Sequence, residues 1–453
     1  MSKFVIIYAT ITPPMHLRRI LFLLGFIMFL TPFTGRSEES NPYASALPSI
    51  PAKDVGIYIE DLRTGDVILD VNGEKLFTPA SVTKLVTTST ALNTSKPGTK
   101  FVTEVVAQGN IKNGVLEGNL VIKAVGDPTI ESRHFPANKG FAEKVAVAVK
   151  QKGITRITGT VVARYKAEYE QPTPAGWMDE DLIHPYGTEF HAVNYADNVV
   201  SLSMPSGRTI PETPGLTVKR TGRNRRARGT TVVEATASQQ IANPVPESTL
   251  CRAVEKALEQ QGVQVGDTPV ADSGKSVTVY SHTSPTMLEI ITSLMHRSDN
   301  LMAEGMLRAT APGKTRNEAT KRELEFWRDK GVDTNGIVIE DGSGLSRNNK
   351  ISPYFLAEVL DWMRVHKNNN NQYVNIFPVA GKSGTMRGFL KGTKLEGKIA
   401  AKTGSMRNVQ CYAGFKLDDN GQPTHLVVLL LNNFSDRAKL KKALEKLLLD
   451  KLS

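Results

Sequence analysis

The sequence predicts an α+β protein in which an antiparallel sheet flanked by helices is interrupted by a large, mainly β insertion. Strand and helix patterns alternate near both ends of the chain, and turn signals separate them. Between them, residues 99–277 carry several short β-rich runs divided by Gly- and Pro-rich turns. Because surface loops tolerate insertions well, the two ends can form one domain around the inserted region.

The first strands and the first helix of the main domain are expected between residues 55 and 91. Val55–Asp61 is β-rich, and the turn Arg63-Thr-Gly-Asp66 leads into a second strand, Val67–Val71. Pro79 is well tolerated near a helix start, because the first N–H groups there have no intrahelical partner. We therefore expect a helix to open at Ser81.

Three more strands and a final helix are expected near the C-terminus. The strands are Lys398–Lys402, Val409–Lys416 and Thr424–Leu431, and Asp418-Asp-Asn-Gly421 is a strong hairpin signal. The helix, Arg437–Leu452, is expected to pack on the sheet rather than to lie on a membrane. The leucines on its apolar face are Leu440, Leu444, Leu447 and Leu448.

We expect four segments along the chain. Residues 1–36 form a signal peptide, residues 37–98 and 278–453 form the two parts of the main domain, and residues 99–277 form one or two inserted β-rich domains. The strands expected in the insertion are Val102–Ala107, Asn119–Lys123, Thr158–Ala163, Val199–Ser203 and Thr231–Ala235.

The N-terminus predicts export. Arg18 and Arg19 precede an apolar run from Ile20 to Leu30, and the first acidic residue is Glu38. This charged start and apolar run fit a secretory signal, and the run is shorter than the ~20 residues that span a bilayer. An uncleaved signal anchor is the alternative. We therefore expect a periplasmic or otherwise extracytoplasmic protein.

The chain is basic, with a net charge of +11 that falls to +7 when the four basic residues of the signal are removed. We expect the main basic cluster to be a solvated loop between the strands Leu216–Lys219 and Thr230–Ala235. The alternative is contact with an anionic envelope polymer or membrane surface. Nucleic acid is not an expected partner of an exported protein. The cluster consists of Lys219, Arg220, Arg223, Arg225, Arg226 and Arg228.

The remaining chemistry-bearing residues exclude several classes of site. Cys251 and Cys411 are too few for a disulfide framework and look like buried small hydrophobes, with one long-range bridge as the alternative. The eight histidines show no metal-ligand spacing, and the sequence has no H-E-x-x-H, Walker loop or G-x-G-x-x-G. It also has no G-x-S-x-G elbow. We therefore expect neither a metal nor a cofactor.

Three short motifs occur in the order that a serine acyl-transfer site requires. They are Ser81-Val-Thr-Lys84, Ser298-Asp-Asn300 and Lys402-Thr-Gly404, a set typical of class A β-lactamases and penicillin-binding proteins. On a helix, positions i and i+3 share a face, so the amine of Lys84 is expected near the hydroxyl of Ser81. A weak hydroxyl beside a group that can take its proton is an activated nucleophile.

The expected catalytic residues are Ser81 as nucleophile, Lys84 as base and Ser298 as proton relay to the leaving amine. A basic role requires Lys84 to be neutral some of the time. Burial and a nearby positive charge both lower the pKa of a lysine, and Lys402 is the expected neighbour.

The expected substrate-binding residues lie in the second and third motifs. Asn300 can hydrogen-bond the substrate amide, and Lys402 and Thr403 suit recognition of a carboxylate. Gly404 allows close backbone approach. The backbone N–H groups of the nucleophile and of Ser405 are candidates for the oxyanion hole.

With these motifs the chain resembles the low-molecular-mass class C penicillin-binding proteins, which are D-alanyl-D-alanine carboxypeptidases and endopeptidases of the penicillin-binding protein 4 type. The resemblance covers nearly the whole mature chain and includes Gly126-Asp-Pro-Thr129, Asp341-Gly-Ser-Gly-Leu-Ser-Arg347 and the long insertion between the first two motifs. It implies a serine β-lactamase/transpeptidase-like domain with two additional β-rich domains.

The resemblance also implies the reaction. Ser81 would be acylated by a peptidoglycan muropeptide stem, with loss of the terminal D-alanine or cleavage of a D-Ala–diaminopimelate cross-link. Water would hydrolyse the acyl-enzyme, and β-lactam antibiotics would trap it. Some members of the family bind the amine of the diamino acid with an acidic residue of the insertion. The candidates for this residue are Asp181, Glu189 and Asp197.

The resemblance resolves the duplicated motifs. The second motif of the family follows an apolar helix, as Met287–His296 precedes Ser298. The similar Ser346-Arg-Asn348 falls inside the Gly-Ser-Gly-Leu-Ser-Arg signature, and Lys382-Ser-Gly384 corresponds to a loop that is not expected to be catalytic.

Two other functions are weighed against this one. A β-lactamase or esterase of the same fold is the first, although the E-x-x-L-N sequence of class A enzymes does not follow Ser298. A catalytically idle cell-wall-binding protein is the second. It predicts binding to peptidoglycan that survives Ser81→Ala and is lost when the basic cluster is neutralised.

Overall fold

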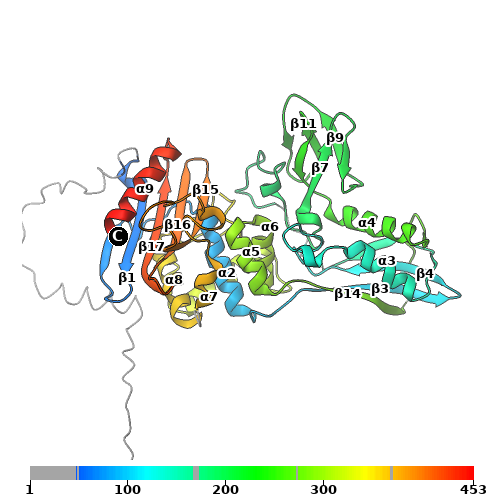
Figure 1. The fold of residues 1–453 in the computed structure, drawn as a ribbon. Helices are drawn as coiled ribbons and strands as arrows, with labels where there is room; N and C mark the ends of the chain where they lie inside the picture. The colour runs from blue at the N-terminus through cyan, green and yellow to red at the C-terminus, as the bar shows by residue number, and fades with distance from the viewer. Residues whose placement is uncertain (1–46, 48–49, 167–172, 272–273, 368–370) are drawn as a thin grey trace, which may run out of the picture.

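The computed structural model describes residues 47, 50–166, 173–271, 274–367 and 371–453. A mixed domain of sheet and helices is joined to an elongated inserted region, which lies on the right of Figure 1. The predicted signal peptide lies outside the described residues. Among the described helices, none has the length and apolar character needed to cross a membrane.

The main domain is built around an antiparallel sheet that both ends of the chain form, as predicted. Its strand order is β15-β16-β17-β1-β2. Alternate side chains of a strand point to opposite faces, so Ile57 and Ile59 pack on one side of the sheet and Tyr58 on the other. The strands are β1 (Val55–Asp61), β2 (Val67–Val71), β15 (Ile399–Met406), β16 (Val409–Leu417) and β17 (Pro423–Asn432).

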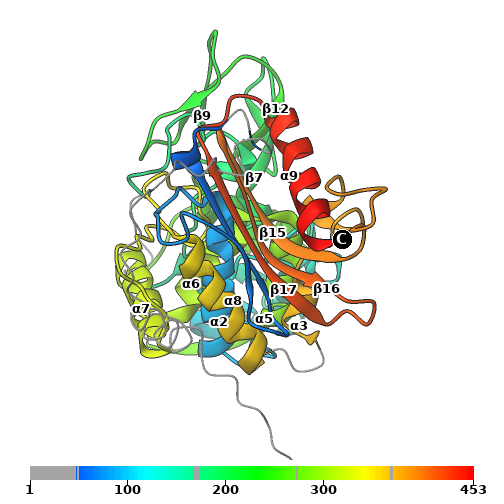
Figure 2. The same cartoon turned by 90° about the vertical axis from the view of Figure 1, so that its left-hand side faces the viewer.

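Helices cover both faces of this sheet. Helix α9 (Arg437–Leu452) lies along one face and buries its leucines against Ile57 and Leu429, which confirms its predicted packing (Figure 2). The remaining helices lie on the other face, around the central helix α2. They are α2 (Thr83–Thr94), α5 (Met287–Arg297), α6 (Asn300–Thr310), α7 (Arg316–Asp329) and α8 (Pro353–Lys367).

Helix α2 starts later than predicted. Ser81 lies in a short 3₁₀ turn, η2 (Ala80–Val82), and the α-helix begins only at Thr83. Ala80 has a φ of 47°, which lies outside the right-handed helical region and prevents the helix from beginning there. Helix α2 is buried from Thr83 through Leu92, because other helices and the sheet surround it.

The described residues of the insertion form one larger sheet and two small ones. The larger sheet has the order β13-β5-β4-β3-β14, with β6 beside β4, and helices α3 (Phe141–Gln151) and α4 (Pro246–Gln260) pack on it. Its strands are β3 (Val102–Lys112), β4 (Val115–Lys123), β5 (Arg156–Ile157), β6 (Val161–Arg164), β13 (Gln264–Val265) and β14 (Ser276–Thr283).

The small sheets have the orders β12-β7-β8 and β10-β11-β9. Within the second, β9 and β11 are parallel and β10 runs antiparallel to β11. Their strands are β7 (Val199–Ser203), β8 (Arg208–Ile210), β9 (Thr217–Arg220), β10 (Arg225–Arg226), β11 (Val232–Ala235) and β12 (Gln239–Ala242).

Two expectations about the insertion need adjustment. The predicted strand Thr158–Ala163 is wrong as a single strand, since the chain bends at Gly159 between β5 and β6. A Cβ atom on Gly159 would lie only 2.2 Å from the side chain of Asn119, so the bend depends on this glycine. The predicted boundary between residues 277 and 278 falls inside β14, which pairs with β3.

The two cysteines are free thiols in the described part of the chain. Cys251 lies half-buried on α4, and Cys411 is buried on β16. Burial raises the pKa of each thiol to about 12, so neither is poised to form a thiolate.

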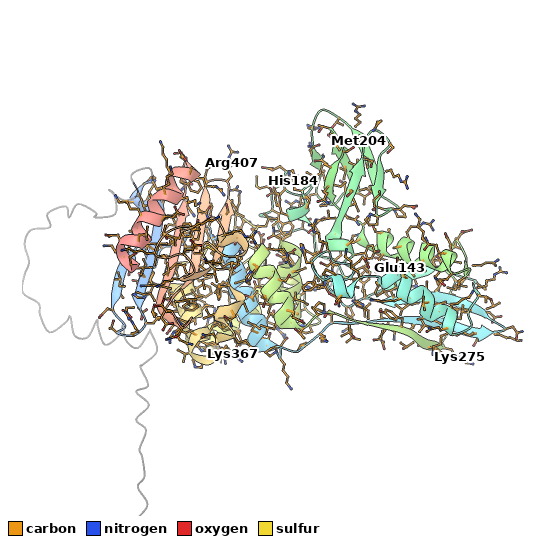
Figure 3. All side chains as sticks on the ribbon, viewed as in Figure 1. Glu143, His184, Met204, Lys275, Lys367 and Arg407 are labelled. Carbon is orange, nitrogen blue, oxygen red and sulfur yellow. The ribbon has the colours of Figure 1, made fainter. Side chains whose placement is uncertain are left out.

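The prediction that the basic cluster is solvated is wrong for Arg226 and Arg228, whose side chains turn inward. Arg225 and Arg226 belong to β10, where neighbouring side chains point to opposite faces, and Arg226 is only 2% exposed. Arg228 also turns inward, toward residues 173–179. The exposed members are Lys219, Arg220, Arg223 and Arg225. The small sheets lie in the upper part of the inserted region, where Met204 is labelled in Figure 3.

Candidate active site

The first motif places an amine directly against the candidate nucleophile. Lys84 is fully buried at the start of α2, and its Nζ donates to the Oγ of Ser81 over 3.0 Å. The same Nζ donates to Asn300 Oδ1 over 2.5 Å and to the backbone carbonyl of Ser343. Three acceptors from three separate elements therefore fix the amine beside the hydroxyl.

A tight backbone contact holds Ser81 in its turn. A Cβ atom on Gly344, which has a φ of 77°, would lie 2.0 Å from the carbonyl oxygen of Ala80. Thr83 Oγ1 also donates to this oxygen, over 2.9 Å. The positive φ of Ala80 is thus retained by contacts on both sides, as is common for strained residues at active sites.

The second motif occupies the turn between α5 and α6. Ser298 caps the C-terminus of α5 in the left-handed conformation, with a φ of 62°, and Asp299 caps the N-terminus of α6. Asn300 is the first residue of α6, so the turn points the second motif toward the lysines. Asn300 accepts from Lys84 and donates through Nδ2 to the carbonyl of Tyr186 over 2.7 Å.

The third motif lies within β15 rather than after it. Lys402 is fully buried, and its Nζ donates to Ser298 Oγ over 2.8 Å and to the carbonyl of Thr403 over 2.6 Å. The structure therefore brings six predicted site residues into two hydrogen-bonded groups, one centred on Lys84 and one on Lys402.

Strand β15 approaches the nucleophile closely at Gly404. A Cβ atom there would lie 2.6 Å from the carbonyl of Pro79 and 3.1 Å from the amide nitrogen of Ser81, so a side chain would push the strand away. Thr403 Oγ1 donates to Thr385 Oγ1 over 2.7 Å at the rim. Ser405 is exposed, and its Oγ accepts from Arg437. The participation of its backbone amide in an oxyanion hole stays a prediction.

Burial sets the protonation of the two lysines. It lowers the pKa of Lys84 to about 8, although the carboxylates of Asp341, Glu304 and Asp299 oppose the shift. Burial also lowers the pKa of Lys402 well below its usual value, and the charge of Lys84 adds to this shift. The sequence analysis expected the reverse, namely that the charge of Lys402 would lower the pKa of Lys84. About a tenth of Lys84 is then neutral at pH 7 and can accept a proton.

The segment after Glu340 completes the site, and no catalytic role was predicted for it. Asp341 is fully buried and accepts from the amides of Gly344 and Ser346 over 2.8 and 2.7 Å. It also accepts from Trp177 Nε1 over 2.6 Å. These bonds fix the turn that presents the Ser343 carbonyl to Lys84. In the sequence, the glycines on both sides of Ser343, directly after Asp341, indicate this tight turn.

Glu304 is a second residue that the sequence analysis missed. It lies one turn after Asn300 on α6, is 4% exposed, and accepts from the amide of Ser343 over 2.8 Å. Burial raises the pKa of Glu304 to about 7, and the nearby carboxylate of Asp341 adds to the shift. Glu304 therefore changes charge near neutral pH, directly behind the turn that binds Lys84. The i,i+4 spacing from Asn300 could have indicated it.

Replacing Glu304 with glutamine is expected to move the pH dependence of acylation. Above about pH 7 the ionised carboxylate raises the pKa of Lys84, and glutamine removes this charge while it can still accept from Ser343. The pKa of Lys84 should fall, so the acid limb of the acylation rate should move to lower pH in stopped-flow titrations.

Glu323 provides a matched control for this substitution. It is fully buried on α7, and burial raises its pKa to about 8, but the carboxylates that act on Lys84 are those of Asp341, Glu304 and Asp299. Glu323→Gln should leave the limb in place. An unchanged limb in Glu304→Gln would show that this carboxylate does not act on the base.

The duplicated motifs and the acidic candidates have defined places. Ser346 Oγ donates to Glu340, and Ser383 Oγ accepts from the amide of Val379 over 2.9 Å. Neither serine contacts a lysine amine in the described contacts. Glu189, one of the acidic candidates, forms an ion pair with the buried Arg226, so its carboxylate already has a positively charged partner.

The other two acidic candidates differ in their surroundings. Asp197 accepts from Ser132 Oγ over 2.5 Å and forms an ion pair with Arg133. Both partners belong to the insertion. Asp181 is half-buried and accepts from the hydroxyl of Tyr186, a half-exposed residue whose carbonyl contacts Asn300. Asp181 is thus linked to Asn300 of the second motif through Tyr186.

Comparisons with known proteins identify the family of the chain. The D-Ala-D-Ala carboxypeptidase 3 (S13) family matches residues 40–449. A D-alanyl-D-alanine carboxypeptidase of Haemophilus influenzae is 23% identical over 84% of this chain and 86% of its own. One of an Actinomadura species is 26% identical over 85% of this chain and 79% of its own.

A similar fold occurs in solved structures. The crystal structure of penicillin binding protein 4 from Haemophilus influenzae covers 91% of this chain and 99% of its own, with a TM-score of 0.75 and 21% identity. Its complex with a β-lactam has a TM-score of 0.71. The predicted fold class, a transpeptidase-like domain with an inserted β-rich region, is confirmed. The chain belongs to the D-Ala-D-Ala carboxypeptidase 3 (S13) family of serine peptidases.

Proposed function

We propose that this chain hydrolyses the D-Ala–D-Ala bond of peptidoglycan stem peptides through an acyl-enzyme on Ser81. The enzyme class, a serine-type D-Ala-D-Ala carboxypeptidase, follows from the family that matches nearly the whole chain. The observation that carries the assignment of residues is the contact of the buried Lys84 amine with Ser81 Oγ over 3.0 Å. The amine donates in this contact, and in its neutral form it can accept the proton of the hydroxyl over the same distance.

The reaction proceeds in two halves. In the first, Lys84 takes the proton of Ser81, Oγ bonds to the carbonyl carbon, and the bond to the terminal D-alanine breaks. The departing amine receives a proton from the pair formed by Ser298 and Lys402, which lie 2.8 Å apart. In the second, water gives a proton to the Ser298–Lys402 pair and its oxygen bonds to the carbonyl carbon of the ester. The bond between that carbon and Ser81 Oγ breaks, and Lys84 returns the proton to Oγ.

Substrate binding is proposed from the same contacts. The amide of Asn300 binds the substrate amide after exchanging its bond with Tyr186, and Lys402 with Thr403 binds the terminal carboxylate. Asp181 at the rim suits the amine of a diamino acid. This contact supports a second activity, cleavage of a D-Ala–diaminopimelate cross-link. β-Lactams acylate the same serine, and the β-lactam complex of the Haemophilus influenzae protein supports this assignment.

Purified muropeptides test the proposal. Monomeric pentapeptide stems should lose one D-alanine, which mass spectrometry detects directly, and cross-linked dimers should separate into monomers if the second activity is present. Enzyme pretreated with benzylpenicillin is the control and should do neither. Hydrolysis of benzylpenicillin without D-alanine release would favour the β-lactamase, and binding to peptidoglycan without either reaction would favour the idle binding protein.

We further propose export to an extracytoplasmic compartment, since the substrate lies there and residues 1–36 resemble a secretory signal. The four exposed basic residues at the β9–β11 sheet support a peripheral contact with an anionic envelope surface. Salt-dependent binding to anionic vesicles would test this contact.

A further inference from the structure

Residues 173–189 of the insertion contact residues of the active site and are called the wall segment below. Its Tyr186 carbonyl accepts from Asn300, and its Trp177 Nε1 donates to Asp341 over 2.6 Å. Trp177 is 2% exposed and packs in a small apolar cluster with Leu182 and Leu345. The wall segment thus touches both groups that orient Lys84, namely Asn300 and the turn after Asp341.

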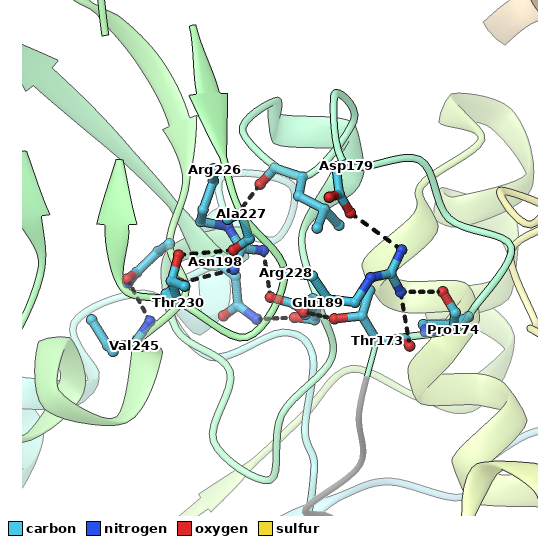
Figure 4. Close-up of polar contacts among 12 residues, drawn as sticks. Thr173, Pro174, Asp179, Glu189, Asn198, Arg226, Ala227, Arg228, Thr230 and Val245 are labelled. Carbon is cyan, nitrogen blue, oxygen red and sulfur yellow. Dashed lines mark hydrogen bonds and ion pairs between the residues drawn. The ribbon is translucent and has the colours of Figure 1, made fainter. Parts of the chain in front are cut away.

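Arg228 binds the backbone of the wall segment at Trp177 and at the residues just before it. Arg228 Nη1 donates to the carbonyls of Pro174 over 2.7 Å and Thr173 over 3.1 Å, as Figure 4 shows. Its Nη2 donates to the carbonyl of Trp177 over 2.6 Å and lies 3.4 Å from the carboxylate of Asp179. A planar guanidinium has several donors in fixed directions, so one side chain can hold three carbonyls at once.

Arg226 secures the other end of the wall segment. It is 2% exposed, its Nε donates to the carbonyl of Leu182 over 3.1 Å, and it forms an ion pair with Glu189. Truncating Arg226 would leave Glu189 as a partly buried and uncompensated charge, which destabilises a fold. Arg228, at 34% side-chain exposure, is the better residue for a test.

We propose that Arg228 is a positioning residue for catalysis. It holds Trp177 against Asp341, and Asp341 in turn fixes the carbonyl of Ser343 on the amine of Lys84. The small β10-β11-β9 sheet therefore contributes to the orientation of the catalytic base, although it lies in the insertion. This inference rests on the proposed roles of Ser81 and Lys84.

The rate of acylation by benzylpenicillin provides the readout, measured by timed mass spectrometry on the full chain. Arg228→Ala should lower the second-order rate constant about 10-fold, since small displacements of catalytic groups are costly. Arg225→Ala removes the same charge from the exposed face of β10 and should stay within about twofold of the wild type. A role limited to stability would reduce the fraction of molecules that react, and not the rate constant of those that do.

A double-mutant cycle tests the route through Trp177. Trp177→Phe should slow acylation by itself, and adding Arg228→Ala should then change the rate constant less than about twofold. The inference would be overturned if the two substitutions reduced the rate constant independently, so that their separate effects multiplied in the double variant. It would also be overturned if Arg228→Ala had the rate constant of the wild type. Arg228→Lys keeps the positive charge but lacks the planar guanidinium that binds several carbonyls, so it should restore only part of the rate. If Arg228→Ala does not fold, Arg228→Lys takes its place in the experiment.

The proposed function and this inference can fail separately. If wild-type protein forms no adduct on Ser81, the proposed function is wrong. If the wild type forms the adduct and the cycle shows no coupling between Arg228 and Trp177, only the inference is wrong.

Discussion

Replacing Ser81 with alanine should abolish release of D-alanine from pentapeptide stems, with a loss of at least about 10⁴-fold in rate. The substitution removes the only atom that can form the proposed ester and leaves the amine of Lys84 with its two other acceptors, Asn300 and Ser343. The measurement is the rate of D-alanine release under saturating substrate. The fold should persist, because the substitution removes only the hydroxyl of a half-buried side chain, and thermal unfolding serves as the check.

Ser405→Ala is a suitable comparison for this loss. Ser405 is an exposed serine on β15 whose hydroxyl contacts Arg437, while its proposed role involves only its backbone amide. It should therefore retain most of the hydrolytic rate. D-alanine release that continues unabated in Ser81→Ala would show that another residue is the nucleophile.

Replacing Lys84 with methionine should lower the acylation rate about 10²- to 10⁴-fold, the range for loss of a general base. Methionine has nearly the same length and keeps the buried site filled, but it cannot take the proton of Ser81. It also leaves Asn300 Oδ1 without the donor that now lies 2.5 Å away. Acylation by benzylpenicillin, followed by mass spectrometry, measures the change.

Lys350→Met gives the matched control. Lys350 is half-buried and donates to Thr78 Oγ1 over 2.9 Å, outside the two hydrogen-bonded groups of the site. Its variant should acylate within about threefold of the wild type. Equal losses in both variants would mean that the loss of a lysine weakens the fold, and that Lys84 is not the base.

The main sheet could be predicted because its strands carry strong local patterns. Val55–Asp61 and Val409–Lys416 are apolar runs bounded by turns, and the structure places both as antiparallel strands close to the predicted bounds. The contact between Ser81 and Lys84 could be predicted as well, because residues three positions apart in a helical turn lie on the same face. Such features depend on the local sequence alone.

Other features depend on contacts between distant segments. The chain enters α2 late because Gly344 packs on the carbonyl of Ala80, a contact across more than half of the chain. The ion pair of Arg226 with Glu189 turns a residue of an apparently solvated cluster inward. Local spacing could have drawn attention to Glu304 and Asp341, but their contacts with the backbone around Ser343 join segments that are distant in the sequence.

Intact-protein mass spectrometry after incubation with benzylpenicillin, followed by peptide mapping, tests the central claim most directly. Opening of the lactam ring expels no fragment, so the protein should gain the full mass of the drug, and the adduct should map to the peptide that contains Ser81. An adduct on any other residue would contradict the assignment of the nucleophile. Rapid hydrolysis of the drug without an adduct, or no reaction at all, would contradict the proposed penicillin-sensitive D-Ala-D-Ala carboxypeptidase.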